Sequence, residues 1–282
     1  MKKRLNILLI ILVLCLGGYI AYDKILSNDI EKSKEEQEKI IITEDFSLVE
    51  AEHLLEKFGF KENLGCKSTV LDVSYKDEFK VITALKNIDK TKMKKVSCNK
   101  LFSGNETISG GKYYKTKYGA CPKNKEVDAI PYKEANQIYK SMYGTDLAKL
   151  GVSGTTVTGQ YYQFYEYVAS IDSFVKLECA ACDGTCAESY TVSKIKSAKI
   201  TGDTLLIDVY YLHGTPIYNN ITHQSIFRIE TSKISENSIS KNVEEFEKEV
   251  EKDYLDKLDV YEIEFEKNGD NFIFKSLIKQ LS

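Results

Sequence analysis

The first 22 residues restrict the architecture of this chain more than any other segment. The basic residues Lys2 to Arg4 precede about 18 residues, Leu5 to Tyr22, that contain no charged side chain. At about 1.5 Å per helical residue, this stretch is just long enough to cross the hydrocarbon core of a bilayer. Basic residues resist translocation, so we expect residues 1–4 to stay in the cytoplasm and the rest to lie outside. The sequence therefore predicts a single-pass protein of the cell membrane with an extracellular C-terminal domain.

Two alternatives to a retained anchor at residues 5–22 stay open. A cleaved signal peptide needs small residues at the cleavage site, and the segments 16–18 (LGG) and 19–21 (YIA) supply part of that pattern. A lipid-modified Cys15 needs a small residue before it, where this chain has Leu14. All three outcomes place the body of the protein outside the cytoplasm.

The segment 23–45, which follows the apolar stretch, is predicted to be a stalk. Its central part, Asn28 to Lys39, consists almost entirely of charged and polar residues with good helix propensity. It lacks an apolar face wide enough to pack against a core. We therefore expect a solvated helical stalk between the anchor and the folded part.

The remainder of the chain has the composition of a folded protein. Hydrophobic residues make up 43% and charged residues 29% of the sequence, and the formal net charge is −3. Because acidic and basic residues are interspersed, the basic face of a nucleic-acid-binding protein is absent and no nucleic-acid partner is expected. The length allows two small domains, which we place at residues 46–128 (an N-terminal α+β subdomain) and 129–282 (a C-terminal α+β domain).

Helices are predicted where apolar residues recur at helical spacing. The four segments are Leu48–Phe58, Tyr75–Ile88, residues 131–143 and Val243–Lys257. Ser47 and Glu50 form a capping box for the first, and Ser74 can cap the second, although Phe79–Leu85 also permits a strand. Pro131 suits the first turn of the third helix, and Gly144 its end.

Strands dominate from Gln160 to Thr231 and again near the C-terminus. A Gly202-Asp203 turn sets Ile200 opposite Leu205, Ala198 opposite Ile207 and Lys196 opposite Val209. An Asn268-Gly269 type I′ turn sets Phe265 opposite Phe272 and Ile263 opposite Phe274.

A third predicted hairpin pairs Lys94–Phe102 with Tyr113–Cys121 around a glycine-rich loop. Because strands and helices do not alternate as βαβ units, we predict an α+β fold of antiparallel sheets with packed amphipathic helices.

Six cysteines follow Cys15 and form an even set in a segment predicted to be exported: Cys66, Cys98, Cys121, Cys179, Cys182 and Cys186. In that compartment they are expected to form disulfides. Cys182 and Cys186 flank an Asp183-to-Thr185 turn and are predicted to form a disulfide across it. Cys98 and Cys121 bracket the glycine-rich loop and are the second predicted pair. Cys66 and Cys179 are then paired by exclusion.

Other chemistry is possible in principle for Cys179, Cys182 and Cys186. A thioredoxin-like couple at Cys179 and Cys182 needs a helix after the motif, and the chain instead continues into a strand-like segment. A zinc site needs a fourth ligand, for which His213 or His223 would have to serve. His53 is expected on an exposed helix surface. We predict no catalytic residue, no metal and no cofactor, and the alternative of a thiol-redox or metal-dependent enzyme stays open.

The segment Tyr161 to Tyr167 concentrates aromatic residues and has two interpretations: a core strand, or a platform for a carbohydrate or peptide. The glutamates Glu262, Glu264 and Glu266 recur with period two, which indicates the solvated face of a strand and not a catalytic pair.

Several segments carry a resemblance: the basic N-terminus with its single apolar span, PYKEANQIYKSMYG, GDTLLIDVYY and YEIEFEKNGDNFIFKSL. With these, the chain resembles uncharacterised single-pass membrane-anchored exported proteins of low-GC Gram-positive bacteria. The C-terminal half is similar in outline to cystatin-like folds, at the level of fold alone. The resemblance implies a location and no activity. The expected function is a non-enzymatic binding or interaction module of the cell envelope, with the membrane and an envelope protein or glycan as partners.

Overall fold

The computed structural model describes residues 43–61, 71, 76–104, 106–108, 111–155, 161–178, 189–222 and 224–280. The predicted anchor and most of the predicted stalk lie outside these residues. The chain divides into two compact units, Met1–Ile42 and Thr43–Ser282, and the second contains everything described below. In that described part, no helix is long and apolar enough to cross a membrane.

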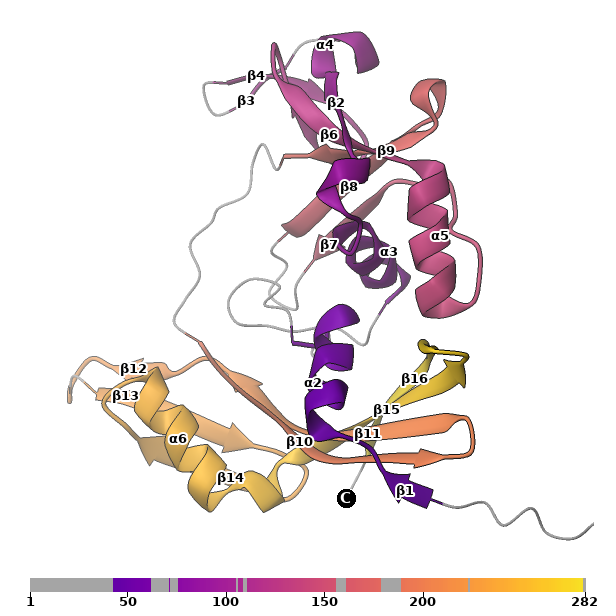
Figure 1. The fold of residues 1–282 in the computed structure, drawn as a ribbon. Coiled ribbons are helices and arrows are strands. Elements are labelled where there is room, and N and C mark those ends of the chain that lie inside the picture. Colours follow the sequence, from indigo (N-terminus) through magenta and orange to yellow (C-terminus); the bar gives the residue numbers. More distant parts are fainter. Residues whose placement is uncertain are drawn as a thin grey trace, which may run out of the picture. The chain divides into compact units, whose positions relative to one another are not determined.

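The described residues form antiparallel sheets with a few packed helices, which confirms the α+β class (Figure 1). One five-stranded sheet has the order β1 (Thr43–Asp45), β10 (Tyr190–Thr201), β11 (Thr204–Gly214), β15 (Asp259–Asn268), β16 (Asn271–Gln280). The other has the order β2 (Lys94–Ser97), β6 (Glu126–Pro131), β9 (Ser173–Leu177), β8 (Tyr161–Val168), β7 (Val152–Thr155). Two three-stranded sheets consist of β3 (Glu106–Ile108), β4 (Gly111–Lys115) and β5 (Ala120–Pro122), and of β12 (Ile217–Asn219), β13 (Gln224–Glu230) and β14 (Ser235–Ile239).

The helices are α2 (Leu48–Lys57), α3 (Asp77–Lys86), α4 (Cys98–Leu101), α5 (Tyr132–Tyr143) and α6 (Val243–Asp253), and short 3₁₀ helices lie at Lys90–Lys92, Ala169–Ile171 and Leu255–Lys257. Four of them occupy the segments predicted from periodicity. Ser47 accepts a hydrogen bond from the Glu50 N–H at 3.4 Å, as the capping box requires. Gly144 ends α5 with φ of 74°, a left-handed conformation that glycine adopts without strain.

The predicted cap of α3, Ser74, lies outside the described residues. The helix begins at Asp77, and Lys76 precedes it without a side-chain cap hydrogen bond. Asp77 and Glu78 stand in the first turn, where their negative charge stabilises the helix N-terminus. The alternative strand at Phe79–Leu85 is excluded, because these residues are helical.

The hairpin of β10 and β11 has the predicted register near its turn. Ile200 lies opposite Leu205 and Ala198 opposite Ile207. The prediction for Lys196 is wrong, since a β-bulge between Ile195 and Ser197 sets Ile195 opposite Val209. The bulge inserts one residue into β10 and returns the apolar Ile195 to the face that packs on the core.

The register predicted for the C-terminal hairpin is also wrong. The turn is Gly269-Asp270, with φ of 61° at Gly269, and it shifts the pairing by two residues so that Phe265 lies opposite Phe274. Between the turn and Phe265, a shift of two keeps the side chains on their predicted faces. A bulge between Glu264 and Phe265 then sets Ile263 opposite Leu277 and not opposite Phe274. The glycine serves as the first turn residue, as Gly202 does in the β10–β11 hairpin.

The predicted hairpin of Lys94–Phe102 with Tyr113–Cys121 does not form. Strand β2 pairs with β6, residues 98–101 form helix α4, and the glycine-rich segment makes its own hairpin of β3 and β4. Helix α4 begins directly after β2. The strand therefore cannot extend far enough to pair with β5.

The largest hydrophobic cluster lies where α2, α3 and α5 pack on both five-stranded sheets. Its centre is aromatic: the ring of Phe58 lies 5.0 Å from that of Phe265 and 5.7 Å from that of Tyr143. Residues from before and after position 128 contribute to this cluster, and the boundary predicted between 128 and 129 falls inside β6.

A second cluster lies under α6. The rings of Phe246 and Phe227 stack 4.5 Å apart, and Tyr190 contacts Phe246 edge-on at 4.8 Å. This helix covers β10 and one face of β13, as its apolar stripe predicted. Strands β10 and β11 contribute to both clusters and so connect them.

Candidate functional site

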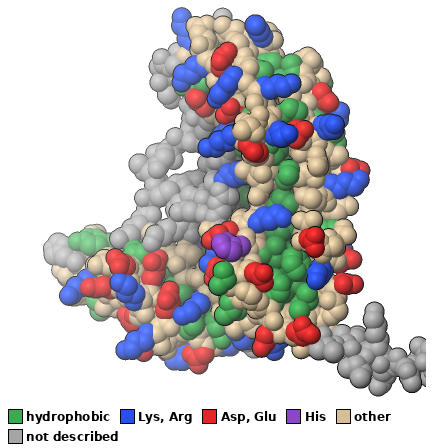
Figure 2. Space-filling view, in the orientation of Figure 1, with side chains coloured by type: hydrophobic (Ala, Val, Ile, Leu, Met, Phe, Trp, Pro, Cys, Tyr) green, Lys and Arg blue, Asp and Glu red, His purple; other side chains and the backbone are tan. Residues whose placement is uncertain are grey.

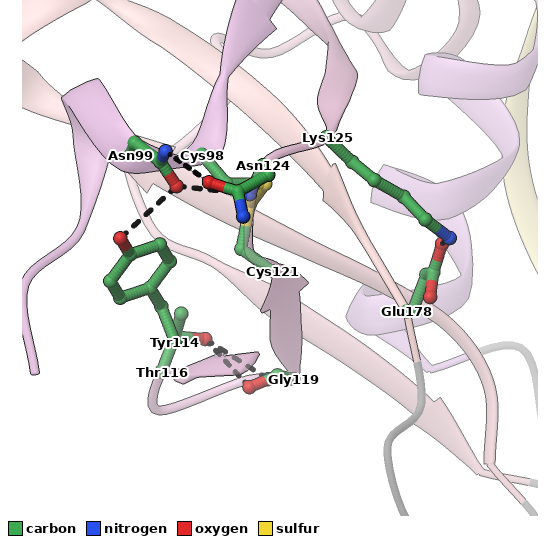
Figure 3. Close-up of a disulfide and its surroundings, with 9 residues drawn as sticks. All are labelled: Cys98, Asn99, Tyr114, Thr116, Gly119, Cys121, Asn124, Lys125 and Glu178. Carbon is green, nitrogen blue, oxygen red and sulfur yellow. Dashed lines mark hydrogen bonds and ion pairs between the residues drawn. A yellow bond between two sulfur atoms is a disulfide. The ribbon is translucent and has the colours of Figure 1, made fainter. Parts of the chain in front are cut away.

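Cys98 and Cys121 are joined by a disulfide, with their Sγ atoms 2.09 Å apart (Figure 3). Cys98 opens α4 and Cys121 lies in β5, and both are fully buried. The predicted pair is therefore confirmed, although the hairpin on which it was based does not form. The bridge holds α4 against the small sheet of β3, β4 and β5.

A set of side-chain hydrogen bonds reinforces this disulfide (Figure 3). Asn99 Nδ2 donates to Asn124 Oδ1 at 2.8 Å, and the Asn124 N–H and Tyr114 OH donate to Asn99 Oδ1 at 3.0 and 3.1 Å. Asn124 has φ of 57°, a conformation that asparagine tolerates better than most residues. The arrangement is structural, because these polar side chains bond to one another and to the backbone N–H of Asn124 near the bridge.

The other predicted cysteines are Cys66, Cys179, Cys182 and Cys186, and all lie outside the described residues, as His223 does. Their pairing, and the redox or zinc chemistry considered for them, stays a prediction. His213 Nδ1 lies 3.0 Å from Thr191 Oγ1, and His53 Nδ1 lies 3.6 Å from Glu56 Oε2 at the surface of α2. Within the ranges that the structure covers, no group of three or more His, Cys, Asp and Glu side chains is placed to hold a metal ion.

Two aromatic residues of β8 belong to the core, and the side chains of Tyr161 and Tyr162 lie outside the described part. Phe164 and Tyr165 are buried on opposite faces of the sheet, each in a different hydrophobic cluster. For these two residues the core interpretation is confirmed, and they are not available as a flat platform.

Tyr167 belongs to a polar cluster with Lys149 and Asp172. Lys149 Nζ lies 2.8 Å from Asp172 Oδ1 and 4.3 Å from the centre of the Tyr132 ring, and the Tyr167 hydroxyl donates to the same Asp172 oxygen. The hydrogen bond from Lys149, followed by that from Tyr167, lowers the pKa of Asp172. Since the charges neutralise one another, this cluster fastens the loop after α5 to the sheet and offers no net charge to a ligand.

A cavity of about 490 Å³ lies beside this sheet and differs from the clusters above in its charge. We call it the lysine cavity. Its apolar lining consists of Leu85, Met93, Ile130 and Tyr165, and its charged lining of Lys86, Lys90, Lys95, Lys176 and Asp128.

The sheet itself positions the charged residues of the lysine cavity. Lys95 on β2 lies opposite Asp128 on β6, and Lys176 on β9 lies opposite Tyr165 on β8. Because strand residues alternate between faces, these side chains share the face that also carries the buried Ile130. The end of α3 and the following 3₁₀ helix stand over this face and supply Lys86 and Lys90.

The lysine cavity has an excess of positive charge. Asp128 Oδ1 is paired with Lys95 Nζ at 2.8 Å. Neither Lys90 nor Lys176 has an ion-pair partner among the described residues. Four lysine ammonium groups and one carboxylate therefore surround the apolar lining of the cavity, although the net charge of the whole chain is −3. This arrangement can bind an anion that also has an apolar part.

Sequence reasoning did not find the lysine cavity. Its residues come from six helices and strands and from the segment before β2, and no local motif connects them. One signal was present in the sequence: Lys176 interrupts the apolar run of the strand Ser173–Leu177 (SFVKL).

A second cavity, of about 450 Å³, lies between α2 and the turns of the two long hairpins. Phe46, Leu54, Ile200 and Phe272 form its apolar part. Figure 2 shows that hydrophobic side chains are exposed between charged ones on one face of the molecule. The charged residues of the cavity have both signs: Glu50 and Asp270 are acidic, and Lys57 and Lys267 basic. This second cavity therefore does not favour ligands of one charge sign, whereas the lysine cavity favours anions.

No protein-family model matches this chain, and no curated protein or solved structure is significantly similar to it.

Proposed function

We propose that the protein is a membrane-anchored, extracellular, non-enzymatic binding module whose lysine cavity takes an anionic component of the cell envelope. The observation that supports this proposal is the presence of four lysines around the apolar lining of one cavity, in a chain that is acidic overall. The class of ligand is an organic anion with phosphate or carboxylate groups and an apolar portion.

The physical basis is electrostatic. An anion that enters the cavity meets Lys90 and Lys176, neither of which has to give up an ion pair with a described residue. Hydrogen bonds between charged groups contribute about 1.5–3 kcal/mol each. Leu85, Met93 and Ile130 exclude water from one side of the ligand and so strengthen these interactions.

Two features support the extracellular location. The N-terminal segment has the sequence of an anchor with its basic end in the cytoplasm. The buried disulfide of Cys98 and Cys121 is of a kind that persists mainly in oxidising compartments. Protease digestion of intact cells, followed by detection of a C-terminal tag, tests this location, and protection of the tag would contradict it.

Charge reversal tests the lysine cavity. The variant K90E/K176E changes two side chains without a described ion-pair partner, so folding is expected to be unaffected, whereas binding of polyphosphate should weaken at least about tenfold. Binding is measured by titration at low and at physiological salt, and the affinity of the native protein should fall as salt rises.

The matched control is K241E/K252E, which makes the same change of net charge at exposed positions next to and on α6. This control should retain most of the affinity for polyphosphate. An equal loss of affinity in both variants would mean that polyphosphate binding depends on net charge alone, and would contradict the proposed ligand site.

A further inference from the structure

The hairpin of β12 and β13 lies in a long segment without charge. From Val209 to Phe227 the sequence contains no Lys, Arg, Asp or Glu, although these residues make up 29% of the chain. The first part of this segment is explained by burial, because β11 lies within the five-stranded sheet. The part from Thr215 onward is not, since it includes exposed positions.

Large apolar side chains are exposed on and beside this hairpin. Ile221 in the turn is 90% exposed, and Ile217, Tyr218 and Ile239 are each more than half exposed. Ile217 and Ile239 flank Ile226 in register across the three strands. We call Ile217, Tyr218, Ile221 and Ile239 the apolar tip.

The isoleucines of the apolar tip, Ile217, Ile221 and Ile239, belong to none of the hydrophobic clusters formed by the described residues. Asn219 Oδ1 accepts hydrogen bonds from the N–H groups of Ile221 and Thr222 at 2.9 and 3.2 Å, which fixes the turn. Helix α6 packs against the face of β13 that carries Phe227. The row of isoleucines is on the opposite face, because Ile226 is the neighbour of Phe227 in the strand.

We infer that the apolar tip inserts into the boundary between the headgroups and the acyl chains of a lipid bilayer. Aliphatic residues and tyrosine favour this boundary, and charged side chains oppose insertion. The segment from Thr215 to Phe227 contains no charged side chain that would have to lose its hydration on entering this boundary.

This inference rests on the proposed membrane location. The 20 residues 23–42 lie between the predicted anchor and the first described residue. Fully extended they span at most about 70 Å, which permits the tip to reach the bilayer that holds the anchor.

The absence of tryptophan from the sequence allows a direct test. The variant I221W in the full chain carries one tryptophan at the apolar tip, and L150W carries one at a position that is also well exposed, outside the tip. Each is reconstituted in phosphatidylcholine–phosphatidylglycerol vesicles with or without brominated acyl chains, which quench tryptophan on contact. The tryptophan of I221W should lose at least about half of its emission and shift to the blue, and that of L150W should do neither.

A second variant excludes an effect of the tryptophan itself. I217N/I221W/I239N replaces two exposed isoleucines with polar residues and should lose most of the quenching. Flotation of the vesicles reports the anchor separately. If the protein floats with the vesicles but I221W and L150W are quenched equally, this inference is overturned and the predicted membrane anchor stands. If the protein does not float, both the anchor and the insertion of the apolar tip are overturned. A blue shift without bromine quenching would indicate a protein partner and would also overturn it.

Discussion

Asp259, at the start of β15, is almost completely buried and has three close donor groups from two residues. Lys279 Nζ lies 2.7 Å from its carboxylate, and Ser232 donates from N and Oγ at 2.9 and 2.6 Å. Burial alone would raise the pKa of Asp259, but the hydrogen bonds from Lys279 and Ser232 together outweigh it and lower the pKa. The charged form is therefore favoured in the folded state. Asp259 connects the loop after β13 to the end of β16.

The variant D259N tests this role. A group with a lowered pKa contributes stability above its unfolded value, near 4, and loses it as the pH falls through the folded value. At pH 7 we expect D259N to cost about 2 kcal/mol of unfolding free energy, measured with urea, because Lys279 loses its partner. Below pH 4 the difference from the native protein should shrink. The control D253N removes the partner of Lys252 at an exposed site and should change stability by less than about 0.5 kcal/mol. A difference for D259N that is constant with pH would contradict the assignment.

Among the connections between elements, the disulfide between α4 and β5 is covalent. It joins positions that are 23 apart in the sequence. In the chain-entropy account, a loop of this size stabilises the folded state by about 3 kcal/mol, because it restricts the unfolded chain.

The variant C98S/C121S should therefore lose about 3 kcal/mol of unfolding free energy in guanidinium. Treatment of the native protein with a reductant under native conditions should leave this bridge intact for a long time, since both sulfurs are buried. Thiol labelling followed by peptide mapping measures this protection. Rapid labelling of Cys98 in the folded protein would show that the bridge opens without unfolding.

The same elements show how far the sequence could predict the fold. Helices α2, α5 and α6 were predictable because capping residues, glycine stops and apolar stripes are local signals. The pairing of β2 with β6 was not, since no local signal specifies which strand a four-residue segment joins. The register of β15 with β16 was missed by two residues because both positions satisfy the alternation of faces, and only the place of Gly269 distinguishes them. The lysine cavity was missed for a similar reason: its residues meet only after the sheet has formed.

At the scale of the whole molecule, β10 and β11 extend through both large hydrophobic clusters. Ala198 and Ile207 belong to the cluster under α2, and Val192 and Leu212 to that under α6. The two clusters thus share a pair of strands that is hydrogen-bonded along its length.

We therefore expect residues 43–280 to unfold as one cooperative unit. The variant F246A, which empties the centre of the smaller cluster, should lower stability by about 3–4 kcal/mol. Calorimetry and near-ultraviolet circular dichroism of tyrosine should show a single transition that moves as a whole. The variant F174A removes a buried ring from the other five-stranded sheet. Calorimetry and circular dichroism should again report the same single transition. Two separate transitions, only one of which responds to F246A, would instead indicate independent domains.

Strand β1 pairs with the end of β10, and the hydroxyls of Thr43 and Thr201 meet 2.8 Å apart across 158 positions of sequence. A ribosome or translocon delivers the chain from its N-terminus, so β1 and α2 emerge long before the strand on which they pack. During that interval the apolar side of α2 has no native surface to cover it. Synthesis of this protein therefore includes a period in which the apolar side of its leading segment is exposed to aggregation.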